Sequence, residues 1–314
     1  KNSVSRFVEC SEMSNLELAN TIYDDGIDIL VDLGGYTHKQ VWSLLFKPAP
    51  IICQYLGFLG TYGMKEVDYI FADKFTIPEN IASYYTEKPF YINCGLNKFV
   101  FSNPNFVPPE VDTVLPYSKN NYITFGSFNG MSKLNNYTVK LWSKVLKKVP
   151  NSKLLIYRTS IKDVDKERLT RQFRKCGIND DRFYFDSEPK SPHFLSYPAC
   201  DISLDASPYG GLTVAIEEAI MGIPTIALVG KTFAAKGAGR VNKALNLEKE
   251  LNAYTEAEYV RKAAALANDI EKLQYMRINL RDIVYGSSLC NDFEEYVREI
   301  ENGYLSMWNE FTCS

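Results

Sequence analysis

One thirty-residue stretch, 201–230, constrains the fold of this chain more than any other. Apolar residues alternate over Asp201–Asp205, which predicts a buried strand that ends in carboxylates. Ser207–Gly211 has the composition of a turn, with one proline and two glycines that permit a close backbone approach. The pattern then predicts a helix over Thr213–Met221, a stop at Gly222–Pro224, and a second apolar strand. Strand, glycine turn, helix and strand form one βαβ unit of a parallel sheet.

The glycine turn predicts an anion site, because it leaves backbone N–H groups free at the start of a helix. Glu217 lies one helical turn after Thr213 and faces the same way, so its carboxylate is placed to accept two ribose hydroxyls. Its neighbour Glu218 points about 100° away and is expected to be solvated. This arrangement outlines a nucleotide site. The other interpretation is an ordinary strand–turn–helix without any ligand, which is common in α/β proteins.

Composition narrows the function classes. The chain has 314 residues, which is enough for two domains with full cores. Its net charge of −3 does not indicate the positively charged surface that nucleic-acid binding requires. No apolar run reaches membrane-spanning length. Seven scattered cysteines, never spaced as CxxC, indicate reduced thiols and a cytoplasmic setting. With only His38 and His193 in the chain, no histidine-based metal site is expected.

The first part of the chain predicts one parallel-sheet lobe. Short apolar strands alternate with helices and with glycine-rich turns, which is typical of such a sheet. The expected elements are a helix over 15–24, strands over 27–33, 51–55, 68–72 and 89–93, and glycine turns over 34–37 and 57–63. Glycine turns at strand ends are where open α/β sheets bind ligands, although simple tight turns are the favoured interpretation without other evidence.

A second lobe follows a proline-rich linker. Residues 102–117 contain four prolines and show no helical or strand period, so domains are expected over 1–113 and 114–314. The expected elements of the second lobe, beyond the stretch 201–230, are strands over 122–128, 153–158 and 182–186 and helices over 136–149, 167–176, 191–197, 256–268, 270–283 and 292–311. The predicted fold is α/β, with two Rossmann-like lobes and a ligand site in the cleft between them.

Several spaced motifs resemble one known family. FGSFNGMSKLN (125–135), PAPIICQYLGFLGTYG (48–63), DISLDASPYGGLTVAIEEAIMGIP (201–224) and LRDIVYGSSLCN (280–291) resemble the catalytic region of protein O-GlcNAc transferases, especially their SPINDLY-like branch. The resemblance runs from about residue 20 to the C-terminus. It implies a GT-B fold whose last helix returns towards the first lobe. It also implies inverting, metal-independent transfer of a sugar from a nucleotide-sugar to Ser or Thr of a protein.

The resemblance also implies roles for individual residues. Lys133 matches a lysine beside the donor diphosphate, where a positive charge stabilises the charge that develops on the leaving group. Glu217 matches the ribose carboxylate, and His193 matches a residue near the donor base. The remaining expected nucleotide-sugar contacts are Asn129, Lys190, Gly210, Gly211, Leu212 and Thr213, the last three through backbone N–H groups. No metal and no cofactor beyond the donor is expected, and UDP is favoured over GDP.

The chain departs from the family pattern in two places. Leu212, Thr213 and Val214 stand where vertebrate members have a histidine and two threonines, which leaves fewer side-chain contacts to the donor. The family's first βαβ unit is expected upstream of Lys1, so the first lobe is predicted to be incomplete without that segment or a second subunit. No residue stands out as general base. Three candidates follow the first expected strand or lie within it: Asp28, Asp32 and Tyr36.

These expectations define two functions from different classes. The leading one is a protein O-glycosyltransferase, with GlcNAc favoured as the sugar and glucose and fucose left open. The alternative is a non-catalytic GT-B partner subunit of an active glycosyltransferase. The smaller number of expected side-chain contacts to the donor favours this alternative. A sugar-nucleotide epimerase is less favoured, because it would require acids and bases that the sequence does not show.

Overall fold

The computed structural model describes residues 4–313, and this part of the chain forms two compact units. Unit 1 comprises the residues up to Asn97 together with those from Asp292 onward. Unit 2 comprises Lys98–Asn291. The boundary therefore lies earlier than the expected one at 113/114, and the last helix belongs to unit 1.

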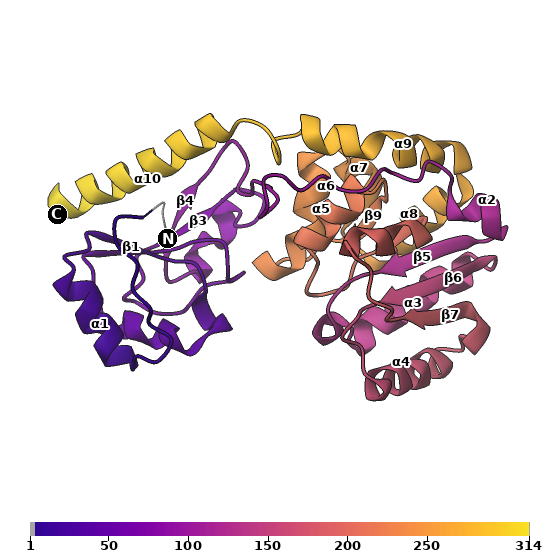
Figure 1. The fold of residues 1–314 in the computed structure, drawn as a ribbon, viewed down its shortest axis with the longest axis horizontal. Coiled ribbons are helices and arrows are strands. Elements are labelled where there is room, and N and C mark those ends of the chain that lie inside the picture. The colour runs from indigo at the N-terminus through magenta and orange to yellow at the C-terminus, as the bar shows by residue number, and fades with distance from the viewer. Residues whose placement is uncertain (1–3, 314) are drawn as a thin grey trace. The chain divides into compact units, whose positions relative to one another are not determined.

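Unit 1 is built on a four-stranded parallel sheet with strand order β1-β2-β3-β4 (Figure 1). Its strands are β1 Ile29–Asp32, β2 Ile51–Gln54, β3 Tyr69–Ala72 and β4 Lys88–Tyr91. Its helices are α1 Asn15–Asp24 and α10 Phe293–Cys313, with 3-10 turns at Gly35–Thr37, Lys39–Phe46 and Glu79–Tyr84. The strand β2 is buried throughout, as expected for a central parallel strand covered on both faces.

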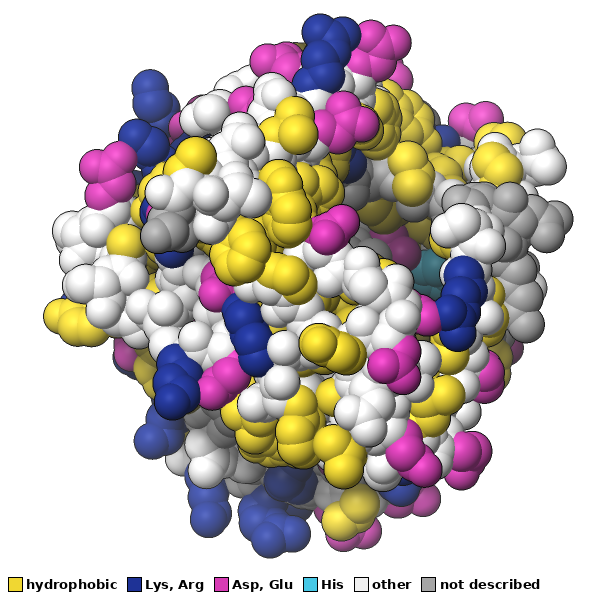
Figure 2. All heavy atoms as spheres, turned by 90° about the vertical axis from the view of Figure 1, so that its left-hand side faces the viewer, with side chains coloured by type: hydrophobic (Ala, Val, Ile, Leu, Met, Phe, Trp, Pro, Cys, Tyr) yellow, Lys and Arg dark blue, Asp and Glu magenta, His cyan; other side chains and the backbone are white. Residues whose placement is uncertain are grey.

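The helix α10 packs on this sheet through one narrow face. The Tyr304 ring meets Phe71 of β3 edge-on, with centroids 5.6 Å apart, and Met307 is fully buried against Cys53 of β2. Figure 2 looks onto the side of unit 1 and shows hydrophobic patches between side chains of both charge signs. Trp42 and Phe46 are among the exposed hydrophobic residues of this unit.

Unit 2 contains a six-stranded parallel sheet with strand order β10-β9-β8-β5-β6-β7 (Figure 1). Its strands are β5 Ile123–Ser127, β6 Ser152–Tyr157, β7 Phe183–Asp186, β8 Ile202–Leu204, β9 Thr225–Leu228 and β10 Asn252–Ala253. Its helices are α2 Pro116–Asn120, α3 Asn136–Lys148, α4 Asp163–Lys175, α5 Thr213–Ile220, α6 Gly237–Ala244, α7 Glu248–Leu251, α8 Glu256–Asn268 and α9 Ile270–Gly286. The sequence pattern assigned no element to the region that holds α6, α7 and β10.

The strand order reverses beside β5, and this reversal positions the candidate site. From β5 the chain builds outward through β6 and β7, and then returns to add β8 on the other side of β5. Phe125 of β5 pairs with Ile202 of β8, so the carboxyl ends of these two strands lie side by side. Such a switch point is where open parallel sheets bind ligands.

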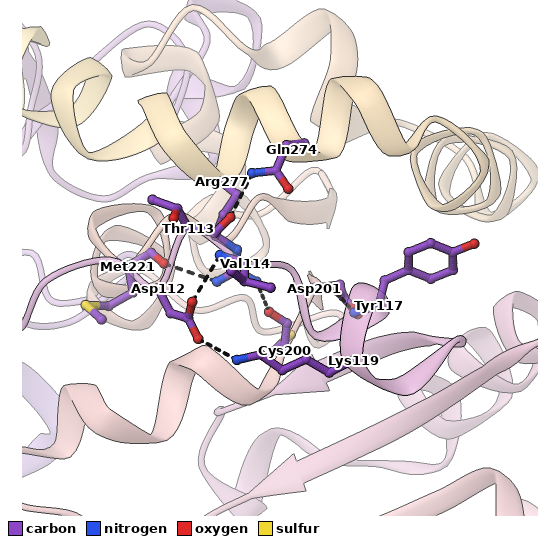
Figure 3. Close-up of polar contacts among 10 residues, drawn as sticks. All are labelled: Asp112, Thr113, Val114, Tyr117, Lys119, Cys200, Asp201, Met221, Gln274 and Arg277. Atoms are coloured by element: carbon purple, nitrogen blue, oxygen red, sulfur yellow. Dashed lines mark hydrogen bonds and ion pairs between the residues drawn. The ribbon is translucent and has the colours of Figure 1, made fainter.

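The predicted linker is packed against unit 2, which explains the earlier boundary. The Arg281 side chain of α9 donates to the Pro109 carbonyl at 2.5 Å, and Gln274 donates to the Thr113 carbonyl at 2.7 Å. Asp201 accepts the backbone N–H of Tyr117 at 3.0 Å, as Figure 3 shows. Because its backbone is bound at several points, the segment is part of unit 2 and is not a free tether.

A buried arginine joins α9 to the sheet beneath this segment. The guanidinium of Arg277 donates to the carbonyls of Cys200 and Met221, and Figure 3 shows both contacts. Arg277 is 1% exposed, and burial lowers its pKa. The contacts tie the C-terminal helix of unit 2 to the residues that lead into β8.

Candidate functional site

The candidate site starts from Asp205, which directly follows β8 at the switch point. Its carboxylate oxygen Oδ1 accepts the backbone N–H of Gly211 at 2.8 Å and the amide of Asn129 at 3.3 Å. Complete burial raises the pKa of Asp205 to about 7, although these donors and Lys133 act to lower it. Asp205 therefore joins the turn after β5 to the glycine turn after β8.

Lys133 lies over the glycine turn. Its ammonium Nζ donates to the Gly210 carbonyl at 2.8 Å and stands 4.1 Å from the centroid of the Tyr209 ring. Burial lowers the pKa of Lys133, while the charge of Asp205 opposes that shift. A lysine placed in this way presents a positive charge at the entrance to helix α5, where the helix dipole also favours anions.

Two backbone N–H groups of the glycine turn already donate hydrogen bonds to acceptors within unit 2. The Gly210 N–H donates to the Ala234 carbonyl at 3.1 Å, and the Gly211 N–H is the one taken by Asp205. The structure thus differs from the expectation that Gly211 offers its N–H to a phosphate. Leu212 and Thr213 follow at the start of α5, which has no side-chain cap, and Thr213 is exposed.

Gly210 is also required by the close approach of Asp205. A Cβ atom at this position would lie 2.6 Å from Asp205 Oδ2, far inside van der Waals contact. A side chain would therefore push the turn away from the carboxylate that holds it. The glycine permits the packing on which the rest of the site depends.

Glu217 and His193 meet on the adjacent face of α5. Glu217 Oε2 lies 3.1 Å from His193 Nε2 and accepts the Tyr197 hydroxyl at 2.6 Å. The histidine side chain is 58% exposed and its ring contacts Phe194, with centroids 4.4 Å apart. The side chains predicted at the ribose and at the base are therefore neighbours in the structure.

The prediction for Glu218 is wrong. Glu218 is 1% exposed, and its two oxygens accept the hydroxyls of Ser203 at 2.7 Å and Thr225 at 2.6 Å. Burial raises its pKa to about 8. The reason is that α5 turns this face onto the sheet, where β8 and β9 each supply a hydroxyl.

Lys190 forms an ion pair with a nearby carboxylate. Its ammonium pairs with Glu188 at 2.5 Å, and the pair raises the pKa of the lysine. Its placement near a donor base stays a prediction. Sequence reasoning did not assign a role to Tyr197 or Tyr209, because a tyrosine in a turn or short helix carries no pattern of its own.

Two of the three base candidates of unit 1, Asp32 and Tyr36, use their side chains in internal contacts. Asp32 accepts the Gly35 N–H at 2.6 Å and the hydroxyl of Tyr62. The Tyr36 hydroxyl donates to the Tyr62 carbonyl at 2.5 Å, and Asp28 is exposed. These bonds stabilise the loops after β1 and β2.

Comparison with known proteins decides the family. The model of glycosyl transferase family 41 matches residues 1–101 and 113–300. The chain belongs to this family. The family 41 chain is 31% identical over 303 residues to a tomato (Solanum lycopersicum) protein named probable UDP-N-acetylglucosamine–peptide N-acetylglucosaminyltransferase SPINDLY, and this match covers 94% of the chain. It is also 31% identical over 320 residues to an Arabidopsis thaliana protein named probable UDP-N-acetylglucosamine–peptide N-acetylglucosaminyltransferase SEC, and this match covers 98% of the chain.

A solved structure supports the fold of this family 41 chain. A mutant of the Thermobaculum terrenum O-GlcNAc transferase superimposes with a TM-score of 0.85 at 26% identity, covering 99% of this chain and 59% of that one. The predicted GT-B fold is confirmed. The chain spans about a third of the length of the curated relatives, 32% for both plant proteins.

Two further observations concern the described residues alone. Within residues 4–313, no helix has the length and apolar character needed to cross a membrane. In the same range, no three His, Cys, Asp or Glu side chains are grouped so that they could hold a metal ion.

Proposed function

We propose that this family 41 chain transfers a sugar from a nucleotide-sugar donor to a Ser or Thr hydroxyl of a protein. The observation that carries the proposal is the position of Lys133 over the glycine turn at the switch point of unit 2. The names of the plant relatives support a protein acceptor, UDP as the carrier and GlcNAc as the sugar. Inversion at the anomeric carbon and independence from metal are part of the same proposal.

The chemistry follows from the charges around the turn. When an acceptor hydroxyl attacks the anomeric carbon, the bond to the nucleoside diphosphate breaks and negative charge grows on the departing phosphate. Lys133 and the N-terminal end of α5 face that charge, and their stabilisation is greater in the transition state than in the ground state. Glu217 accepts hydrogen bonds from the ribose, and His193 lies next to it for contact with the base.

The first test is calorimetry with UDP and with GDP on the chain and on Glu217→Ala. The proposal expects the unmodified chain to bind UDP more tightly than GDP and Glu217→Ala to bind less tightly. Absence of binding for both nucleotides would refute it. Incubation with UDP-GlcNAc and an acceptor peptide rich in Ser and Thr should then release UDP and add one sugar mass to the peptide.

The second candidate is a non-catalytic partner subunit. The internal use of the Gly210 and Gly211 amides favours it, since it leaves fewer donors for a diphosphate. The two candidates differ in donor hydrolysis. A transferase slowly releases free nucleotide from UDP-GlcNAc without acceptor, and Lys133→Ala abolishes that release, whereas a partner subunit shows no release at all.

A further inference from the structure

Tyr197 is a buried tyrosine whose hydroxyl contacts a carboxylate of the candidate site. It lies in the 3-10 helix His193–Ala199 and is 3% exposed. Its ring packs against Phe128, which follows β5, with centroids 4.6 Å apart. A buried hydroxyl is costly unless it is hydrogen-bonded, and this one donates to Glu217 Oε2 at 2.6 Å.

The two carboxylate oxygens of Glu217 differ in their hydrogen-bonding partners. Oε2 receives both the Tyr197 hydroxyl and His193 Nε2, whereas Oε1 accepts no hydrogen bond from residues 4–313. The Glu217 side chain is 15% exposed. One oxygen is thus held by the protein, and the other stays available to a ligand.

We infer that Tyr197 is a positioning residue that orients Glu217 for the vicinal hydroxyls of the donor ribose. The inference rests on the proposed function, in which Glu217 is the ribose contact. A free glutamate side chain must lose rotamer freedom when it binds a diol, and this loss weakens binding. The hydroxyl of Tyr197 removes that freedom in advance, because the tyrosine ring itself is fixed by Phe128.

The variant Tyr197→Phe removes one oxygen atom and keeps the packed ring. Calorimetry on the whole chain uses UDP and GDP, each compared with its 2′,3′-dideoxy form, which lacks the hydroxyls that Glu217 would bind. We expect the variant to bind the ribonucleotide about tenfold more weakly, the usual effect of losing a hydrogen bond to a charged group. The dideoxy form should bind the variant and the unmodified chain within about twofold of each other, because its affinity does not depend on Glu217.

Tyr157→Phe is the matched control. Tyr157 also packs against the Phe128 ring, with centroids 5.8 Å apart, and its hydroxyl donates to the Glu188 carbonyl and not to a carboxylate. The control should therefore leave the ratio between ribose and dideoxy affinities unchanged. Thermal unfolding of both variants reports whether either substitution disturbs the fold.

The outcomes separate the inference from the proposed function. Equal weakening of ribose and dideoxy forms by Tyr197→Phe, or tighter binding of the ribose form, overturns the positioning role while the proposed function stands. If the unmodified chain binds neither UDP nor GDP, the proposed function fails and the inference fails with it. If Tyr197→Phe does not fold, Phe128→Leu replaces it: loosening the packing that fixes the Tyr197 ring should cause the same selective loss, and a loss equal for both forms refutes the inference.

Discussion

The buried carboxyl of Glu218 makes the stability of unit 2 depend on pH in a way that one substitution can isolate. Glu218→Gln keeps the shape of the side chain and its hydrogen-bonding partners, the hydroxyls of Ser203 and Thr225. It removes only the ability to ionise. The comparison with the unmodified chain therefore measures the cost of burying this acid.

The magnitude follows from the shift in pKa from 4.5 to about 8. Below pH 4.5 the group is protonated in the folded and unfolded chains and adds no pH dependence. Between pH 4.5 and 8 the unfolded chain has lost the proton while the folded chain keeps it, so the free energy of unfolding falls by about 1.4 kcal/mol per pH unit. The loss reaches roughly 5 kcal/mol above pH 8 and then stays constant.

The assay is urea unfolding between pH 5 and 8.5, read by fluorescence of Trp142, which is fully buried in unit 2. Trp42→Phe and Trp308→Phe in both proteins remove the tryptophans of unit 1. We expect the stability advantage of Glu218→Gln to grow steadily with pH. Glu167→Gln, at an exposed position on α4, controls for the loss of a charge alone. An advantage that does not change with pH would refute the reasoning.

Three further predictions concern the site and the backbone that supports it. Lys133→Ala should lower turnover by about a hundredfold or more while weakening UDP binding much less, since the lysine charge acts mainly on the departing phosphate. Steady-state kinetics measures the turnover and calorimetry measures the UDP affinity. Equal losses of turnover and of UDP affinity would contradict a transition-state role. Gly222→Ala should destabilise unit 2 by at least about 2 kcal/mol, because residue 222 has a φ of +76° and a Cβ there would lie 2.4 Å from the Arg277 carbonyl oxygen. The control is Gly286→Ala, because a Cβ at residue 286 would meet nothing within 4 Å. The control should be near neutral in the same denaturation experiment. Asp201→Ala should cost roughly 3 kcal/mol, because it leaves the buried N–H of Thr124 and the part-buried N–H of Tyr117 without their acceptor. A loss below about 1 kcal/mol would show that the segment before β5 is held by other contacts.

Much of the candidate site could be predicted because its chemistry lies in short, contiguous segments. The turn Ser207–Gly211 and the start of α5 at Thr213 agree with the sequence pattern, since proline and glycine act on the backbone locally. Glu218 was misjudged for the opposite reason. Helical geometry says that it faces away from Glu217, but only the neighbouring strands decide whether that direction holds water or two hydroxyls.

The region of α6, α7 and β10 escaped prediction because its signals are weak. The strand β10 has two residues and depends on packing against β9 and α8, and α7 has four residues and depends on packing against α6 and β9. A two-residue strand carries no readable alternation of apolar and polar residues. Its place at the edge of the sheet follows from tertiary contacts alone.

The sequence by itself determined the α/β class, the strand–turn–helix units and the family, because periodicity, turn residues and spaced motifs are properties of neighbouring residues. Only the tertiary structure decided which groups meet: Asp205 with Asn129, and Glu217 with Tyr197. These pairs come from segments far apart along the chain. Their contacts arise because the reversal of strand order beside β5 brings the ends of separate strands together, and no local pattern encodes that distance.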